Sequence, residues 1–359
     1  MSRNLLPLEP KPNFAAAVHR MEAFWAGEIL DRPAINLTAP LPDREWLPGG
    51  HYMEGAREDF APIIERTAHN VANTYYAAES MPVYVPSFGP DQWAAWMGAD
   101  LEWSDTDQST NWVIPFVDDW EAAFPLHFET AGPWWTRMVD FMTQLGRAAE
   151  GRFLVSHLDL HSNADALAAI RTPSRLCMDF YDCPRAVDRA MRQVRGLFPL
   201  AYEAFYRAAG MDRSGSIGWV PVYHPGRTNT IQCDFLALIG PEVSRRYVMP
   251  ALEEEASYLD AWTYHLDGPE CLVHLDDLLA LPDPGVIQWT TGARNAPMIE
   301  WMDLLKRIQT STKGLWIPCS AEELKVYMRE LRPERVIYQV GVGSVAEADA
   351  LLAWMVENT

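Results

Sequence analysis

Apolar runs of strand length recur eight times along this chain of 359 residues, and most are followed by a longer stretch with helical periodicity. Alternation of strand and helix is typical of parallel α/β folds, and eight such units is the number that a closed barrel needs. The sequence therefore predicts one α/β domain, a (β/α)8 TIM barrel. The runs are 34–37, 81–86, 153–159, 217–223 taken together with 230–234, 261–265, 286–289, 315–319 and 336–340.

The clearest helix signals lie in the second half of the chain. Between 296 and 309, apolar residues recur at intervals of three and four, as on a helix that packs against a sheet. Ser320 and Glu323 form a capping-box sequence after the seventh run, and Ser344 and Glu347 form another after the eighth. A strand, a short loop and a capped helix make up the repeating unit of a parallel α/β fold.

The N-terminal part of the chain is less regular. We expect residues 1–32 to form an N-terminal extension and residues 33–359 to form the barrel. The segment 82–120 is rich in proline and tryptophan, which predicts loops over one mouth of the barrel. Neither an internal repeat nor a linker-like stretch divides the sequence, so a single barrel domain is the simpler interpretation.

The chain carries 49 acidic and 29 basic residues, a formal net charge of −20. This excess argues against nucleic acid or an anionic membrane as the principal partner, and leaves a small molecule as the expected one. The five cysteines lack C-x-x-C spacing, so neither a disulfide framework nor a four-cysteine zinc site is expected. Without a secretory signal or an apolar run of about 18 to 20 residues, the sequence predicts a cytoplasmic protein. The oligomeric state is left open.

The segment 262–269 combines aromatic and β-branched residues with a histidine and a carboxylate two positions apart, His265 and Asp267. Because successive strand side chains alternate between faces, both should point the same way. Barrel enzymes keep their chemistry at the C-terminal ends of the strands, where an imidazole beside a carboxylate binds a metal or moves a proton. The alternative is a histidine that is simply hydrogen-bonded to a turn carboxylate.

Further polar residues follow other predicted strands. Asp159 and His161 are also two positions apart, and Asp234 follows the strand around residue 231. Their position at strand ends makes them candidates for catalysis or substrate contact. Alternatives remain for this group, because Asp165 and Asp234 would equally serve as helix caps, and Cys319 is of a type that is more often buried than reactive.

The predicted strand 286–289 ends in Gln288 and Trp289, which are further candidates for substrate binding. A tryptophan at such a place is also typical of the layer between barrel and helices. Four more tryptophans, at 93, 96, 103 and 112, lie in the irregular N-terminal part. Their faces could surround a cationic methylated ligand, although core packing is the more common role.

Three segments resemble the uroporphyrinogen decarboxylase superfamily: Leu-Val-Ser-His-Leu-Asp-Leu-His at 154–161, Gln-Cys-Asp-Phe at 232–235 and Tyr-His-Leu-Asp-Gly-Pro at 264–269. The resemblance extends roughly from Pro33 to the C-terminus. It implies an eightfold α/β barrel whose site lies in the mouth at the strand C-termini. The family includes the tetrapyrrole decarboxylase and methyltransferases that move methyl groups between corrinoid proteins and thiols or other acceptors.

At two places the sequence differs from the family's motifs, and these differences bear on which branch of the family the chain resembles. The decarboxylase binds its polycarboxylate substrate with an arginine-rich segment, whereas the matching region here, 36–40, contains no arginine. The methyltransferases place zinc on a histidine-x-cysteine pair and a later cysteine; this chain has His265-x-Asp267 for the pair and Gly-Val-Gly at 341–343. The resemblance thus implies zinc held by nitrogen and oxygen ligands. Cys319 matches no motif of the family and is a candidate sulfur ligand only if its strand faces the same pocket.

The preferred hypothesis is a corrinoid-linked, methyltransferase-like enzyme whose corrinoid is carried by a partner protein. Its predicted catalytic residues are His265, Asp267 and Asp234, and its predicted substrate-binding residues are Asp159, His161, Asp165, Gln288 and Trp289. A rival is a metal-independent decarboxylase or lyase of a small organic acid, which carbon dioxide release would reveal. A third reading is a non-catalytic barrel that binds a corrinoid or a methylated amine, in which replacing Asp267 would weaken binding with no turnover to lose.

Overall fold

The strands form one seven-stranded sheet and three two-stranded pairs in the part of the chain that the structure describes. The structure, a computed structural model, describes residues 5–103, 110–292 and 296–359. Neighbours in the large sheet are parallel except β2 and β1, in the order β2-β1-β13-β12-β11-β10-β9. Its strands are β1 (Ala34–Pro40), β2 (Thr74–Ala78), β9 (Thr228–Gln232), β10 (Ala261–Asp267), β11 (Gly285–Thr290), β12 (Gly314–Pro318) and β13 (Val336–Gly341).

The two-stranded pairs account for the remaining strands. The parallel pair is β3 (Val83–Tyr84) with β6 (Leu154–Val155); the antiparallel pairs are β4 (Leu101–Trp103) with β5 (Asn111–Val113) and β7 (Ser216–Ile217) with β8 (Tyr223–His224). Every one of the eight predicted apolar runs therefore contains a strand. The fold is mixed α/β with a mostly parallel central sheet.

The described ladders do not close into one eight-stranded ring. After β1, the chain turns back as the antiparallel strand β2, which was not expected from the sequence and occupies the edge of β1. The next parallel strand, β3, pairs with β6 in a separate sheet. A backbone hydrogen bond of 2.7 Å from His157 N to Ile217 O links the end of β6 to β7. Closure of a complete barrel stays a prediction.

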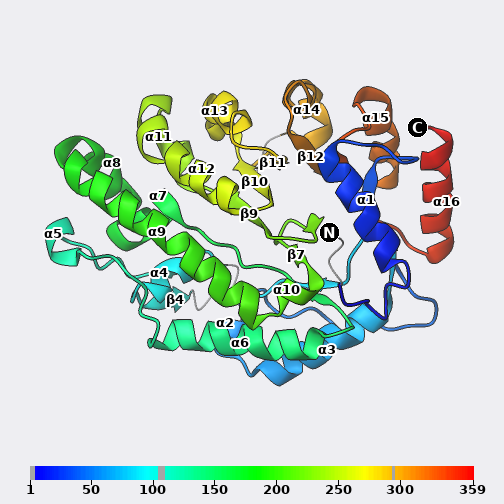
Figure 1. The fold of residues 1–359 in the computed structure, drawn as a ribbon, viewed down its shortest axis with the longest axis horizontal. Helices are drawn as coiled ribbons and strands as arrows, with labels where there is room; N and C mark the ends of the chain where they lie inside the picture. The colour runs from blue at the N-terminus through cyan, green and yellow to red at the C-terminus, as the bar shows by residue number, and fades with distance from the viewer. Residues whose placement is uncertain (1–4, 104–109, 293–295) are drawn as a thin grey trace.

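Helices surround the strands on the outside. In Figure 1, α11, α13, α14, α15 and α16 follow one another around the rim, with β9 to β12 inside them. The helices are α1 (Phe14–Ala26), α2 (Glu54–Arg57), α3 (Phe60–Ala72), α4 (Gln92–Trp96), α5 (Trp120–Ala123), α6 (Pro133–Ala149), α7 (Asn163–Arg171), α8 (Pro173–Asp182), α9 (Pro184–Ala208), α10 (Met211–Ser214), α11 (Pro241–Tyr247), α12 (Met249–Tyr258), α13 (Leu275–Leu279), α14 (Met302–Gln309), α15 (Ala321–Glu330) and α16 (Val345–Glu357), with 3-10 helices η1 (Asp234–Leu238), η2 (Pro269–His274) and η3 (Met298–Trp301). Among the described residues, none of these helices has the length and apolar character needed to cross a bilayer.

The two predicted capping sequences both begin helices. In α15 the box is complete: Ser320 Oγ accepts from Glu323 N at 3.2 Å, and Glu323 Oε2 accepts from Ser320 N at 2.8 Å. In α16 Ser344 Oγ accepts from Glu347 N, but the Glu347 carboxylate accepts from the backbone of Gly343 instead. The predicted helix at 296–309 is realised as η3 followed by α14.

Helix α1 covers the N-terminal ends of the strands. Its apolar face joins a buried cluster with the first residues of several strands, including Ala34, Leu154, Ala261, Val286 and Ile337. The indole Nε1 of Trp25 donates to Tyr223 O at 2.9 Å, which fixes the helix to the β7–β8 pair. The predicted extension thus seals one end of the strand assembly with apolar side chains.

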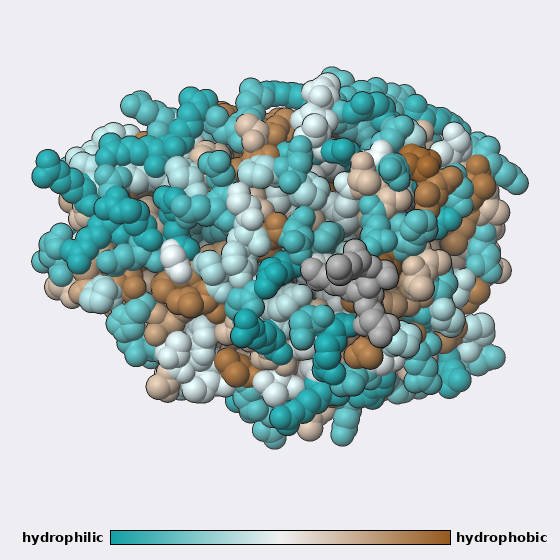
Figure 2. Space-filling model, viewed as in Figure 1, coloured by the Kyte–Doolittle hydropathy of each residue, from teal (hydrophilic) through white to brown (hydrophobic). Residues whose placement is uncertain are grey.

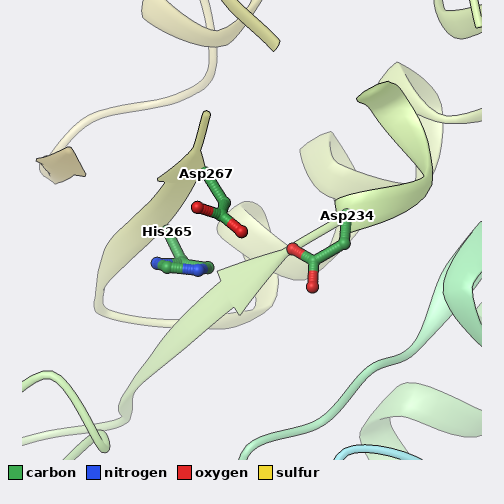
Figure 3. Close-up of side chains that lie close together, drawn as sticks. All are labelled: Asp234, His265 and Asp267. Atoms are coloured by element: carbon green, nitrogen blue, oxygen red, sulfur yellow. The ribbon is translucent and has the colours of Figure 1, made fainter. Parts of the chain in front are cut away.

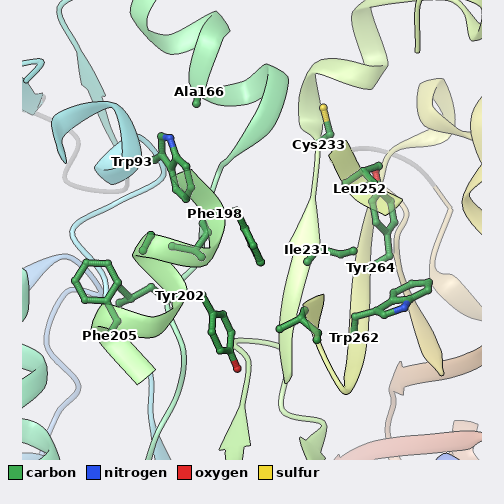
Figure 4. Packing of buried hydrophobic residues seen from close by; sticks show 14 of the residues in the cluster. Trp93, Ala166, Phe198, Tyr202, Phe205, Ile231, Cys233, Leu252, Trp262 and Tyr264 are labelled. Atoms are coloured by element: carbon green, nitrogen blue, oxygen red, sulfur yellow. The ribbon is translucent and has the colours of Figure 1, made fainter. Parts of the chain in front are cut away.

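A larger apolar cluster fills the space between strands and helices. Figure 4 shows Ile231 and Tyr264 from β9 and β10 in this cluster with Phe198 and Tyr202 of α9. The outer surface is different, since the face in Figure 2 is mainly hydrophilic with isolated apolar patches. Because Tyr264 packs in this cluster, its neighbour His265 points to the opposite face of β10.

Candidate functional site

A row of polar side chains crosses the sheet near the C-terminal ends of β9, β10 and β11. His265 is directly opposite Gln232 on one neighbouring strand and Gln288 on the other. Residues in register on parallel strands point to the same face, so these three side chains share one surface. Asp267 lies two residues further along β10 on that same face. The predicted common orientation of His265 and Asp267 is thereby in place.

Asp234 joins this row from the start of η1, immediately after β9. One ligand atom from each of Asp234, His265 and Asp267 lies within 4.8 Å of the other two. Figure 3 shows the two carboxylates and the imidazole turned toward one another. Asp234 is the exposed member of the group and the other two are half-buried, so the cluster opens to solvent. It is the one group of three such side chains found in the described part of the chain.

The donor set suits a divalent metal. One imidazole nitrogen and two carboxylate oxygens are ligands that zinc accepts, at about 2.0 to 2.2 Å from the ion. In the tetrahedral arrangement that zinc adopts, two ligand atoms of one ion therefore lie about 3.4 Å apart. The three ligand atoms here lie within 4.8 Å of one another, so binding zinc requires the side chains to move together by up to about 1.4 Å, and rotation of the exposed Asp234 carboxylate shortens these distances. The residues fit the metal, with three protein ligands and room for a fourth.

The orientation of His265 is fixed by its neighbour on β11. The ring nitrogen Nδ1 is hydrogen-bonded to Gln288 Oε1. The Gln288 amide nitrogen donates to Thr290 Oγ1 at 2.7 Å, which directs the amide oxygen toward the ring. An Nδ1–H that donates to an amide oxygen leaves the lone pair on Nε2 free to bind a metal. Trp219 packs edge-on against the ring with centroids 5.0 Å apart.

A second histidine lies among carboxylates beside this cluster. His161 Nε2 is 3.2 Å from Asp159 Oδ2, and Nδ1 is 3.6 Å from Asp165 Oδ2 and 3.9 Å from Asp234 Oδ2. Burial alone would lower the pKa of His161, but Asp159 and Asp165 outweigh it and raise that pKa well above its usual value. His161 is accordingly an imidazolium at neutral pH. Asp234 belongs to both groups and connects the two histidines.

Although the Asp234 side chain is open to solvent on one side, the protein around it removes part of its hydration, and this effect together with the neighbouring Asp165 raises the pKa of Asp234 to about 6. The imidazoles of His161 and His265 oppose this shift because they favour the carboxylate. Asp165 itself accepts from the backbone nitrogens of Asp234 at 3.0 Å and Phe235 at 2.8 Å. It lies in the first turn of α7, whose N-cap is Ser162. Asp165 therefore ties the start of α7 to the end of β9 and sets the position of Asp234.

Two residues of this region were not predicted from the sequence, Gln232 and Glu255. The side-chain amide of Gln232 lies 2.8 Å from His161 Nε2, where its oxygen is the atom that can accept from an imidazolium, and both Gln232 and Glu255 are almost fully buried. Glu255, on α12, accepts from Ser162 Oγ at 2.6 Å and from Asn163 Nδ2 at 3.2 Å. Burial raises the pKa of Glu255 to about 8. The neutral Glu255 side chain thus fixes the segment between His161 and α7 through its hydrogen bonds with Ser162 and Asn163.

Two predicted site residues lie outside these groups. Trp289 is buried on the helix side of β11, where its ring contacts Trp301 with centroids 5.1 Å apart. Cys319, after β12, is not part of the three-residue cluster in the described chain, and burial raises the pKa of its thiol to about 12. Trp93 and Trp96 are fully buried in the apolar core. Trp93 and Trp96 therefore have the core-packing role that was the alternative to ligand binding.

Comparison with known proteins gives a fold but no family. No protein-family model matches the sequence, and no curated protein matches it significantly. The structure is similar to that of a methyltransferase from Methanosarcina mazei, with a TM-score of 0.61 and 11% sequence identity. The similarity covers 95% of this chain and 98% of the other. At this identity the two proteins share a fold over nearly their whole length, and the chemistry must be argued from the site.

Proposed function

We propose that this protein is a methyltransferase-like enzyme of the uroporphyrinogen decarboxylase superfamily, built on a complete (β/α)8 barrel. The observation that carries the proposal is the cluster of Asp234, His265 and Asp267 at the C-terminal ends of β9 and β10. This is the location at which barrels keep their catalytic residues. The shared fold with a solved methyltransferase supports the same interpretation.

In this proposal, Asp234, His265 and Asp267 hold zinc. Zinc, when bound, acts as a Lewis acid that favours the deprotonated form of a methyl acceptor. Gln288 keeps the His265 ring in the orientation that exposes Nε2. Asp159, His161 and Asp165 line the approach and contact substrate, and the acceptor's proton leaves to solvent on the exposed side of the cluster.

The methyl donor in this proposal is a corrinoid carried by a partner protein in the cytoplasm. The test uses free methylcobalamin as donor, with small thiols and small amines as acceptors, and follows the loss of the methyl–cobalt absorbance. We expect zinc-dependent turnover that falls at least about 100-fold in His265→Ala. His127→Ala, which changes an exposed histidine far along the chain from the cluster, serves as the matched control. Equal turnover by both variants would remove the proposed role of His265.

A second candidate function is favoured by the surroundings of His161. An imidazolium flanked by carboxylates at 3.2 and 3.6 Å is an arrangement for delivering a proton to a carbanion formed by loss of carbon dioxide. A metal-independent decarboxylase or lyase would use it in this way. Release of carbon dioxide from small carboxylic acids by chelator-treated protein, sensitive to His161→Gln and insensitive to His265→Ala, would favour this function over methyl transfer.

A further inference from the structure

A cavity of about 470 Å³ lies beside the cluster and shares Asp234 with it. It is bounded by the start of η1, by α7 and by β5 with the segment before α4. This volume is within the range of small-molecule sites. Its lining residues are Pro90, Asp91, Trp112, Val113, Pro115, His161, Asp165, Ala168, Ala169, Thr172, Pro173, Asp234, Phe235 and Leu238. Asp91 and Trp112 have no part in the site described above.

The charges that line this cavity are mostly negative. Asp91, Asp165 and Asp234 are acidic, and His161 is the one lining group that can carry a positive charge. Neither lysine nor arginine is among the described lining residues. Three carboxylates against one imidazolium leave a net negative charge when all are ionised. An anionic ligand would therefore be repelled, whereas a cation would be attracted.

The remaining walls are apolar and partly aromatic. Trp112 and Phe235 contribute rings, and prolines, alanines, Val113 and Leu238 contribute aliphatic surface. The Trp112 side chain is 42% exposed, and its Nε1 donates to Glu102 Oε2 at 3.0 Å, so its position is fixed while part of its surface stays open. Aromatic and aliphatic walls above carboxylates are unsuited to a hydrated inorganic ion. They suit a cation whose charge is wrapped in methyl or methylene groups.

We propose that this cavity binds a small organic cation, a methylated ammonium compound. Asp91 supplies negative charge in the cavity wall, where Val113 N donates to its Oδ2 at 3.1 Å and holds it in place. Trp112 supplies an aromatic face. The inference rests on the proposed function only in taking this cation, once it has lost a proton, to be the amine that accepts the methyl group. Binding itself requires neither the metal nor the corrinoid.

Isothermal titration calorimetry of the full chain with tetramethylammonium tests the proposal. The protein is kept in a chelator so that metal binding plays no part. The neutral 2,2-dimethylpropanol, which has a similar shape, and acetate are the comparison ligands. We expect tetramethylammonium to bind at least about tenfold more tightly than the alcohol, and acetate not to bind. Equal affinity for the cation and the alcohol would overturn the proposal.

Variants locate the binding in this cavity. Asp91→Asn and Trp112→Ala should each weaken tetramethylammonium binding by about tenfold. Trp46→Ala is the matched control, because Trp46 is another exposed tryptophan that lines a different cavity. If the folded Trp112→Ala and Asp91→Asn proteins bind as wild type does, the inference is wrong, and circular dichroism verifies that each is folded. Cation binding without methyl transfer would leave this inference standing and remove the proposed function.

Discussion

The two ends of the strand assembly are built from opposite kinds of side chain. At the N-terminal ends, Ala261 and Val286 lie in an apolar cluster under α1. At the C-terminal ends of the same strands, β10 and β11, His265, Asp267 and Gln288 face one another. A strand of seven residues can thus contribute to stability at one end and to a polar site at the other. The difference agrees with the usual division in α/β barrels, in which residues at the N-terminal ends of the strands contribute to stability and those at the C-terminal ends form the site.

The largest effect that this comparison predicts is a pH dependence of stability that originates at the polar end. Glu255 has a folded-state pKa of about 8, well above its ordinary value near 4.5. Between these values the unfolded chain has released the proton while the folded protein retains it, so the free energy of unfolding falls as pH rises from about 4.5 to 8. The fall is at most roughly 5 kcal/mol, since each pKa unit corresponds to about 1.4 kcal/mol.

Glu255→Gln should flatten that part of the profile because glutamine keeps the acceptor for Ser162 and Asn163 without titrating. Urea denaturation at pH 5, 6, 7 and 8 measures it. His161, whose pKa is also raised, contributes a fall in the same direction as pH rises through its folded-state value. The Glu255 contribution is therefore read from the difference between the two profiles. Identical profiles for wild type and Glu255→Gln would show that this acid is not buried as described.

The second effect concerns the apolar end. Phe14 is buried on α1, and its ring packs edge-on against Tyr223 with centroids 6.0 Å apart. Phe14→Ala should lower the free energy of unfolding by about 3 to 5 kcal/mol through lost burial and the cavity left behind. At temperatures below the start of its thermal unfolding, the Phe14→Ala protein should still bind zinc as tightly as wild type does. If Phe14→Ala lost as much zinc affinity as His265→Ala does, the proposed separation of roles, stability at the apolar end and metal binding at the polar end, would be wrong.

The third effect tests how the polar end is organised. Gln288→Ala removes the hydrogen bond that holds the His265 ring, without removing a proposed ligand. We expect zinc affinity to fall about 10- to 100-fold. Gln144→Ala, on the exposed surface of α6, is a matched control that should leave the affinity unchanged. An unchanged affinity in Gln288→Ala would mean that the ring is held by other contacts, such as that with Trp219.

The smallest effect is local to one helix. Ser320 caps α15 on the outside of the sheet, where it accepts from Glu323 N at 3.2 Å. Ser320→Ala should cost about 1 kcal/mol of unfolding free energy, measured by thermal denaturation, and should not change zinc affinity. A much larger loss would indicate that the cap also supports the sheet. The adjacent substitution Glu322→Ala, outside the capping pair, gives the baseline.

Much of the frame could be predicted because its signals are local. Apolar runs and capping sequences depend on residues a few positions apart, so all eight runs and both caps were found. Strand β2 could not be predicted in this way, since its antiparallel pairing with β1 depends on contacts between distant segments. That strand occupies one edge of β1, and the described ladders are also interrupted between β6, β7 and β9, so they do not form the expected closed ring.

The site residues likewise fall into those that local sequence predicts and those whose positions depend on contacts between distant segments. The shared face of His265 and Asp267 follows from strand alternation, which also implies that the neighbours Gln288 and Trp289 point to opposite faces. The approach of Asp234 depends on how β9 pairs with β10, which the sequence does not reveal. Glu255 ends a run of three glutamates that reads as a solvated helix face, and its burial depends on where α12 packs.

Zinc titration of the full-length protein against a chromophoric chelator tests the central claim most directly. We predict one tightly bound equivalent in the wild type, an affinity at least about 100-fold weaker in His265→Ala, and wild-type affinity in His127→Ala. Absence of stoichiometric binding by the folded wild type, or equal binding by His265→Ala, would contradict a metal site formed by Asp234, His265 and Asp267.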